Sequence, residues 1–171
     1  MRKFTLVLGL LLFLPAVWGA DARPVITREA GRYAAAWKRS DHQAIVSFLP
    51  APMLRPPGRR AALMNELKNQ FAQARSLGVQ ELDATLGPPS APKQIGRWLA
   101  SVLSVTAVLH SAHLDLTQQT HVLALSADQG KQWSFLLLYE MSQDELNTWF
   151  PEFRGKVFVP TPPEPQLKLV Y

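Results

Sequence analysis

The sequence predicts an α+β domain in which N-terminal helices pack on a strongly curved antiparallel sheet, a cone-like roll. Apolar residues recur at three- and four-residue spacing up to about residue 78, and at every second position beyond it. One late helix is expected between the sheet and a Pro-rich tail. The chain of 171 residues contains no cysteine, so an apolar core must stabilise the domain without disulfides.

Residues 1–22 have the pattern of a secretory signal peptide. Arg2 and Lys3 precede an apolar run over residues 4–14, and residues 20–22 (Ala-Asp-Ala) offer a cleavage site. An uncleaved membrane anchor is the alternative, but the run barely reaches the roughly 17–25 residues of a spanning helix and contains Pro15. We therefore expect an exported protein with no transmembrane segment after cleavage.

Behind the signal peptide we expect a single α+β domain over residues 23–159 and a Pro-rich tail over residues 160–171. The formal net charge of +5 is modest. Basic and aromatic residues are not interleaved on one stripe, so the chain lacks the footprint of a nucleic-acid-binding protein. Export without cysteine favours a bacterial periplasmic or secreted protein over a eukaryotic secretory one.

Three helices are predicted before residue 78. Thr27 is the expected cap of the first, over residues 28–39, and Ser40 or Asp41 starts a shorter one that Pro50 stops. Residues 50–58 contain four prolines and a glycine and predict a loop. The third helix is expected over residues 59–76, and its apolar stripe consists of Leu63, Met64, Leu67, Phe71 and Ala74.

Alternating patterns predict strands over residues 82–86, 97–116, 121–126 and 133–139. The second is long, so we expect a bend or bulge near residues 107–111, and a polar turn over residues 117–119. Asp128-Gln129-Gly130 predicts a tight turn. Leu136, Leu137 and Leu138 are consecutive, which predicts a central strand with both faces covered.

The C-terminal part of the chain predicts one helix and weak strands. Ser142 and Glu145 form a capping box at the start of the helix, which Pro151 ends. Residues 156–159 are expected as a short edge strand. Residues 167–171 either add a strand or hang free. Trp98, at a strand start, is open to either a core or a surface position, and a surface position would suit an interface.

Three segments resemble the nuclear transport factor 2-like superfamily, in an exported bacterial form. Residues 33–41 (Tyr-Ala-Ala-Ala-Trp-Lys-Arg-Ser-Asp) are similar to its opening helix, which often has an aromatic residue, alanines, a Trp and a capping Asp. The hairpin over residues 126–135 and the closing helix with Phe150-Pro151 are also similar. The resemblance implies a cystatin-like cone, often with an internal pocket. The superfamily contains enzymes, binding modules and dimerisation modules, so it does not supply a function.

Aromatic and polar residues of the predicted helices and strands are candidates for lining a pocket. A small apolar molecule is the expected ligand, and filling of the core is the alternative role for each aromatic side chain. The ligand-binding candidates are Tyr33, Trp37, Phe71, His113 and Tyr139.

Metal and catalytic chemistry are not predicted. Four residues near the hairpin are of the types that bind metal ions: His110, His113, Asp115 and His121. Residues 110 and 113, however, face opposite sides of a regular strand, so they would not converge on one ion. There is no cysteine nucleophile, no Gly-x-Ser-x-Gly motif and no Gly-rich phosphate loop. We assign no catalytic residue, no metal ligand and no cofactor.

Arg55, Arg59 and Arg60 form a basic group before and at the start of the third predicted helix. Positive charge there opposes the helix dipole, and a bound anion would relieve the repulsion. The alternative is that the arginines simply extend into water.

The function expected from these features is that of an exported, non-catalytic binding or assembly module of the cell envelope. It would hold a small apolar ligand in the cone, or pair through its sheet with an envelope protein or a second copy. The alternative is a small pocket enzyme of the isomerase or dehydratase type, with acid–base residues inside the cone.

Overall fold

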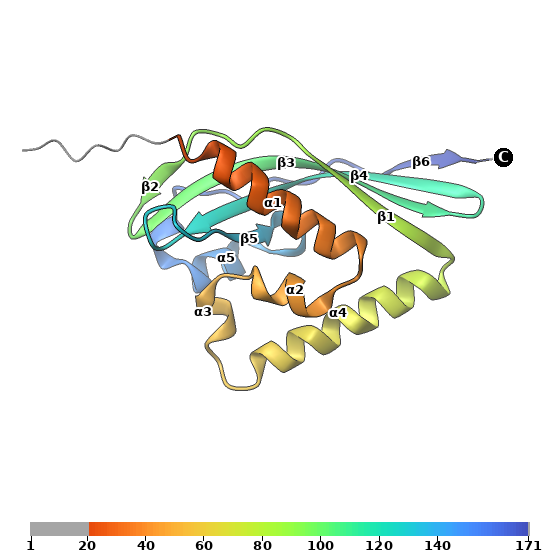
Figure 1. Ribbon diagram of the computed structural model, residues 1–171, viewed down its shortest axis with the longest axis horizontal. Coiled ribbons are helices and arrows are strands. Elements are labelled where there is room, and N and C mark those ends of the chain that lie inside the picture. The colour runs from red at the N-terminus through yellow and green to blue at the C-terminus, as the bar shows by residue number, and fades with distance from the viewer. Residues whose placement is uncertain (1–20, 171) are drawn as a thin grey trace, which may run out of the picture.

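The computed structural model describes residues 21–170, in which most helices precede a single curled sheet (Figure 1). The predicted signal peptide lies outside the described residues, apart from its last two positions. The α-helices are α1 (Arg23–Lys38), α2 (His42–Ser47), α3 (Ala51–Leu54), α4 (Arg59–Ser76) and α5 (Gln143–Trp149).

The described strands form one antiparallel sheet in the order β1-β3-β4-β5, in which β2 also pairs with β3 and β6 with β4. Helices pack against this strongly curled sheet, and the late helix α5 follows its main strands. The predicted α+β class and architecture are therefore confirmed. The strands are β1 (Val79–Leu86), β2 (Lys93–Ile95), β3 (Trp98–Ser111), β4 (Leu114–Ser126), β5 (Ser134–Leu137) and β6 (Gln166–Leu169).

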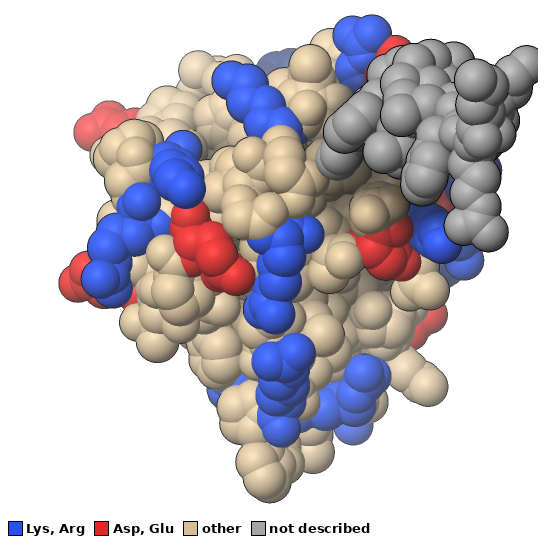
Figure 2. Space-filling view, turned by 90° about the vertical axis from the view of Figure 1, so that its left-hand side faces the viewer, with Lys and Arg blue, Asp and Glu red and all other residues tan. Residues whose placement is uncertain are grey.

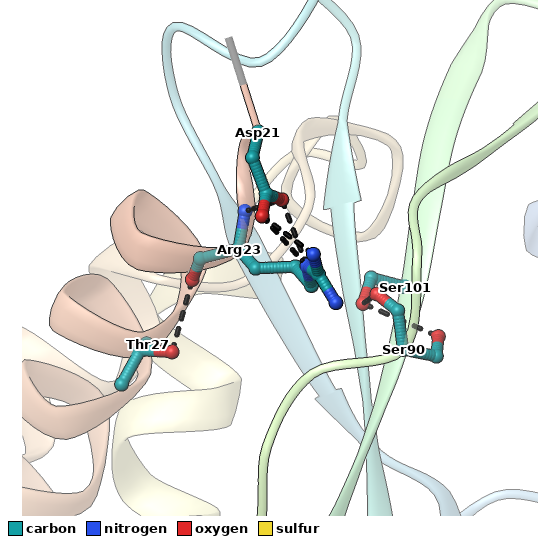
Figure 3. Close-up of polar contacts among 5 residues, drawn as sticks. All are labelled: Asp21, Arg23, Thr27, Ser90 and Ser101. Atoms are coloured by element: carbon teal, nitrogen blue, oxygen red, sulfur yellow. Dashed lines mark hydrogen bonds and ion pairs between the residues drawn. The ribbon is translucent and has the colours of Figure 1, made fainter.

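Helix α1 begins earlier than Thr27 predicts. The Thr27 hydroxyl donates to the carbonyl of Arg23 at 2.9 Å inside the helix, so it is not a cap (Figure 3). The Asp21 carboxylate instead accepts from the backbone N–H of Arg23 at 3.1 Å and from its guanidinium at 2.8 Å. Pro24 lies in the first turn, where a missing N–H costs no intrahelical bond.

The next helices follow the sequence signals with one exception. Asp41 caps α2 by accepting from the N–H of Ala44 at 3.0 Å, and α4 has the predicted bounds. The exception is the stretch 50–58, predicted as a loop, which contains the short helix α3. Pro50 and Pro52 lie at its start, where prolines fit a helix, and Met53 is buried.

Strands β3 and β4 form a longer hairpin than the sequence predicts. The turn is at residues 112–113, and residues 117–119, predicted as a turn, belong to β4. Ser111 closes the turn: its hydroxyl donates to the carbonyl of Leu114 at 2.8 Å and accepts from its N–H at 3.1 Å. The predicted bulge near residues 107–111 is absent from the β3–β4 register, and an irregularity lies in β1 instead.

Strand β5 differs from its prediction in position and length. Leu136 and Leu138 are buried, but β5 is at the end of the strand order rather than at its centre. It ends at Leu137 and continues as a 3₁₀ turn over Leu138–Glu140. The N–H of Phe135 donates to the carbonyl of Phe48 at 2.8 Å, so the end of α2 covers part of this edge.

The β2–β5 end of the sheet is buried on both faces. On the inner face, which α1, α2 and α4 cover, Phe135 and Val122 belong to one apolar cluster. On the outer face, α5 contributes to a second cluster, and Trp98 in it is only 3 % exposed. Of the two positions open to Trp98, the structure shows the core, because α5 and the residues after it cover this face.

The C-terminal residues return to the sheet. Ser142 and Glu145 form the predicted capping box of α5. Residues 156–159 do not form the expected edge strand. The Gln143 side chain instead bonds the backbone of Val157 and Val159, at 3.1 and 2.9 Å. Within the Pro-rich tail, β6 pairs with residues 114–117 of β4.

Candidate functional site

An apolar cavity of about 460 Å³ lies between helices α1 and α4 and the inner face of the sheet. Alternate residues of β1, β3 and β4 face it, because side chains on a strand alternate between the two faces. Its strand lining includes Leu82, Ala84, Leu86, Val105, Ala107, Leu109, Gln118, Thr120 and Val122. The helices and β5 contribute Tyr33, Ala34, Trp37, Phe71, Ala74 and Leu137, among others.

The structure brings four of the five predicted pocket residues together. Tyr33, Trp37, Phe71 and Tyr139 all line the cavity. His113 does not. It is exposed in the turn between β3 and β4, because the hairpin is longer than predicted and places it at the tip. Whether the four lining residues bind a ligand stays a prediction.

Aromatic rings form the wall of the cavity on the α1 side. Tyr33 and Trp37 lie one helical turn apart on one face of α1, and their ring centroids are 6.2 Å apart in an edge-on arrangement. Tyr33 also stacks on Phe135 at 5.4 Å, which ties this wall to β5. Trp37 contacts Phe71 of α4 at 5.7 Å. The wall therefore links both helices and the sheet.

Charged side chains lie at the rim of the cavity, and some of them form ion pairs while others do not. The Glu81 carboxylate is 2.8 Å from Lys38 Nζ, and the Asp83 carboxylate is 2.6 Å from the same atom. Hydrogen bonds to these two carboxylates raise the pKa of Lys38. Arg75, in the last turn of α4, lines the cavity and forms no ion pair with any described residue. Buried polar surface in the lining comes from Thr120, which is 5 % exposed.

His110 and Asp115, two of the residues considered above as potential metal ligands, pair on the other face of the sheet. His110 and Asp115 are directly opposed across β3 and β4, next to the pair Leu109 and Leu116. His110 Nδ1 is 2.8 Å from Asp115 Oδ1, and its Nε2 is 3.5 Å from Asp83 Oδ2. The hydrogen bond to Asp115 raises the pKa of His110. Over residues 21–170, no group of three or more potential metal ligands converges.

The three arginines of the predicted anion site lie at and before the start of α4. Arg59 Nη1 is 3.0 Å from the Glu66 carboxylate, about two turns along the helix. Arg55 and Arg60 are exposed and form no ion pair with described residues. Figure 2 shows Lys and Arg side chains on the lower part of this face of the molecule, with uncharged surface around them. Anion binding there stays a prediction.

Sequence reasoning missed several parts of the cavity. Arg75 and Leu77 lie at the C-terminal end of α4, and Leu77 is 76 % exposed although it lines the cavity. The sequence does predict that a helix ends near residue 76 and that a strand with an apolar face follows it. This junction could have identified Arg75 and Leu77 as residues close to that face. The inward side of β4, including Thr120, is not predicted by the sequence, because the polar residues 117–119 predict a turn.

Comparison of the chain with protein-family models, curated proteins and solved structures finds no match. Within residues 21–170, none of the helices combines the length and apolar character needed to cross a membrane. The curled α+β architecture is compatible with a cone-like fold. Function must therefore be argued from the cavity itself.

Proposed function

We propose that this protein is an exported, non-catalytic binding module of the bacterial cell envelope, with a nuclear transport factor 2-like cone that holds a small apolar ligand. The cavity between α1, α4 and the sheet carries this proposal. Its volume of about 460 Å³ lies within the range of about 300–1,000 Å³ that is typical of small-molecule sites. Aromatic and aliphatic side chains make up most of its described lining.

The charges around the cavity favour binding over acid–base catalysis. A general acid or base must lie within hydrogen-bond reach of the reacting atoms. The described lining contains one acidic residue, Glu81. Its carboxylate is exposed and pairs with Lys38. His113 and Asp115 do not line the cavity, so neither can supply the acid or base of an isomerase or dehydratase site there, and Tyr33 and Tyr139 line it without a further carboxylate besides Glu81. Binding is therefore the function that this geometry supports best.

Export and partners are further parts of the proposal. The pattern of residues 1–22 and the absence of cysteine support a periplasmic or secreted location. An envelope protein or a second copy of this chain is proposed as a partner of the sheet. Exposed Leu167 and Leu169 on β6 supply apolar surface for such a contact.

Filling the cavity tests the binding function. Ala107 lines the cavity from the middle of β3, so an Ala107→Trp substitution would place an indole inside it. We expect the affinity for N-phenyl-1-naphthylamine, an uncharged fluorescent probe, to fall about 10-fold or more, which corresponds to about 1.4 kcal/mol. Probe titration by fluorescence measures this, and circular dichroism verifies the fold.

The matched control is Ala112→Trp. Ala112 is exposed in the turn between β3 and β4 and does not line the cavity. We expect this variant to bind the probe like the wild type. Equal affinities of the wild type and Ala107→Trp would show that the probe, if bound, lies elsewhere, and would refute the proposed site.

A further inference from the structure

The rim of the cavity carries one positive charge that the described residues do not neutralise. Arg75 lines the cavity, lies on an exposed helical turn, and has no carboxylate partner among residues 21–170. Glu81, the acidic lining residue, shares Lys38 with Asp83 and forms no ion pair with Arg75. Arg75 also lies at the negative end of the α4 dipole, but that end carries only about half an elementary charge. The Arg75 guanidinium is therefore available to an anion.

The cavity behind this rim is lined mostly by apolar side chains. Its lining extends along β1 from Val79 to Leu86, which spans about 23 Å at about 3.3 Å per residue. An apolar lining that reaches this far along a strand can follow the length of an extended alkyl chain.

We infer that the ligand is a single-chain amphiphile with an anionic head group, whose chain occupies the cavity and whose head group pairs with Arg75. This inference rests on the proposed binding function and specifies its ligand class. Leu77, two residues beyond Arg75, supports it, because this exposed side chain extends the apolar lining to the rim where chain and head group would meet. Carboxylate and phosphate head groups share the required chemistry, since both accept hydrogen bonds from a guanidinium.

Calorimetric titration with four twelve-carbon ligands tests the inference. The ligands are dodecanoate, dodecyl phosphate, dodecanol and dodecyltrimethylammonium, so chain length is constant and only the head group varies. We expect at least one of the two anions to bind about 5-fold tighter than dodecanol, with the cation weakest, as for a partly exposed ion pair. The preferred anion identifies the head-group class.

Variants of two basic residues on the same helix locate the effect. Arg75→Gln should remove the preference for anions over dodecanol. Lys68→Gln is the matched control, because Lys68 is an exposed cation of α4 that does not line the cavity. The control variant should keep the full preference for anions over dodecanol. Raised salt should reduce this preference in the wild type.

The outcomes separate this inference from the function on which it rests. If dodecanol and both anions bind equally, or if Arg75→Gln keeps the preference, the assignment of Arg75 and of an anionic ligand is overturned while apolar binding stands. If no twelve-carbon ligand binds and N-phenyl-1-naphthylamine does, the single-chain class is overturned alone. If neither the ligands nor that probe bind, the proposed function fails too.

Discussion

Replacement of Phe135 by Ala is expected to lower the free energy of unfolding by about 3–5 kcal/mol. Phe135 is fully buried at the centre of the inner cluster. Its ring stacks on Tyr33 at 5.4 Å and lies 5.8 Å from Phe48, so truncation leaves a cavity against both helices. Native domains are stable by about 5–15 kcal/mol, so this loss is a large part of the total.

Urea denaturation followed by circular dichroism measures the effect of Phe135→Ala. The control is Phe158→Ala, because Phe158 is 71 % exposed, and we expect its stability to change by no more than about 0.5 kcal/mol. Similar, small losses for both variants would contradict the packing of β5 against α1 and α2. A large loss for Phe158→Ala would contradict its exposed position.

Replacement of Phe150 by Ala is expected to cost a comparable amount, about 3–5 kcal/mol, in the outer cluster. Phe150 ends α5 and is fully buried. It meets Trp98 edge-on at 5.4 Å and stacks on Phe153 at 5.2 Å. The same urea titration measures the loss, and a value near zero would show that α5 does not seal the outer face.

The two phenylalanines are expected to differ in their effect on ligand binding. Phe135 supports Tyr33, a residue of the cavity wall, so Phe135→Ala should weaken binding of N-phenyl-1-naphthylamine at a temperature where the variant is folded. Phe150 belongs to the cluster on the opposite face, so Phe150→Ala should bind the probe like the wild type. The reverse pattern would assign the binding site to the outer face.

Local signals in the sequence predicted much of the fold. The change of apolar period near residue 78 separates α4 from β1, and Gly78 has the positive φ of 88° expected after a helix. The capping box at Ser142 places α5 correctly. These features depend on residues close together in the chain, and their physical causes are visible in a short segment.

Features that depend on distant contacts were not predictable in this way. The turn at residues 112–113 has no glycine or proline, and a serine hydroxyl closes it, so it lacks the residues by which a turn is usually recognised. Strand β5 looks central from its leucines, but helices cover its faces and α2 its edge. α3 forms in a Pro-rich stretch partly because Met53 gains burial under the outer face.

The candidate site shows the same division. Tyr33 and Trp37 are one helical turn apart, so their shared face is readable from the sequence, and Phe71 lies on the apolar stripe of α4. The role of Arg75 depends on which charges surround it in three dimensions. His113 is predicted to line the cavity but lies in the turn between β3 and β4. The sequence predicts this turn a few residues too late, and such an error moves a residue from a strand into the turn.

Methyl-resolved NMR during separate titrations with dodecanoate and N-phenyl-1-naphthylamine tests the central claim, that the cavity between α1, α4 and the sheet binds a ligand. We predict saturable shifts of the methyl groups of Leu82, Val105 and Val122, which line the cavity. The methyl groups of Leu146, in the outer cluster, should stay unchanged. Shifts at Leu146 with none at the three lining residues, or no saturable shifts at all, would contradict the account.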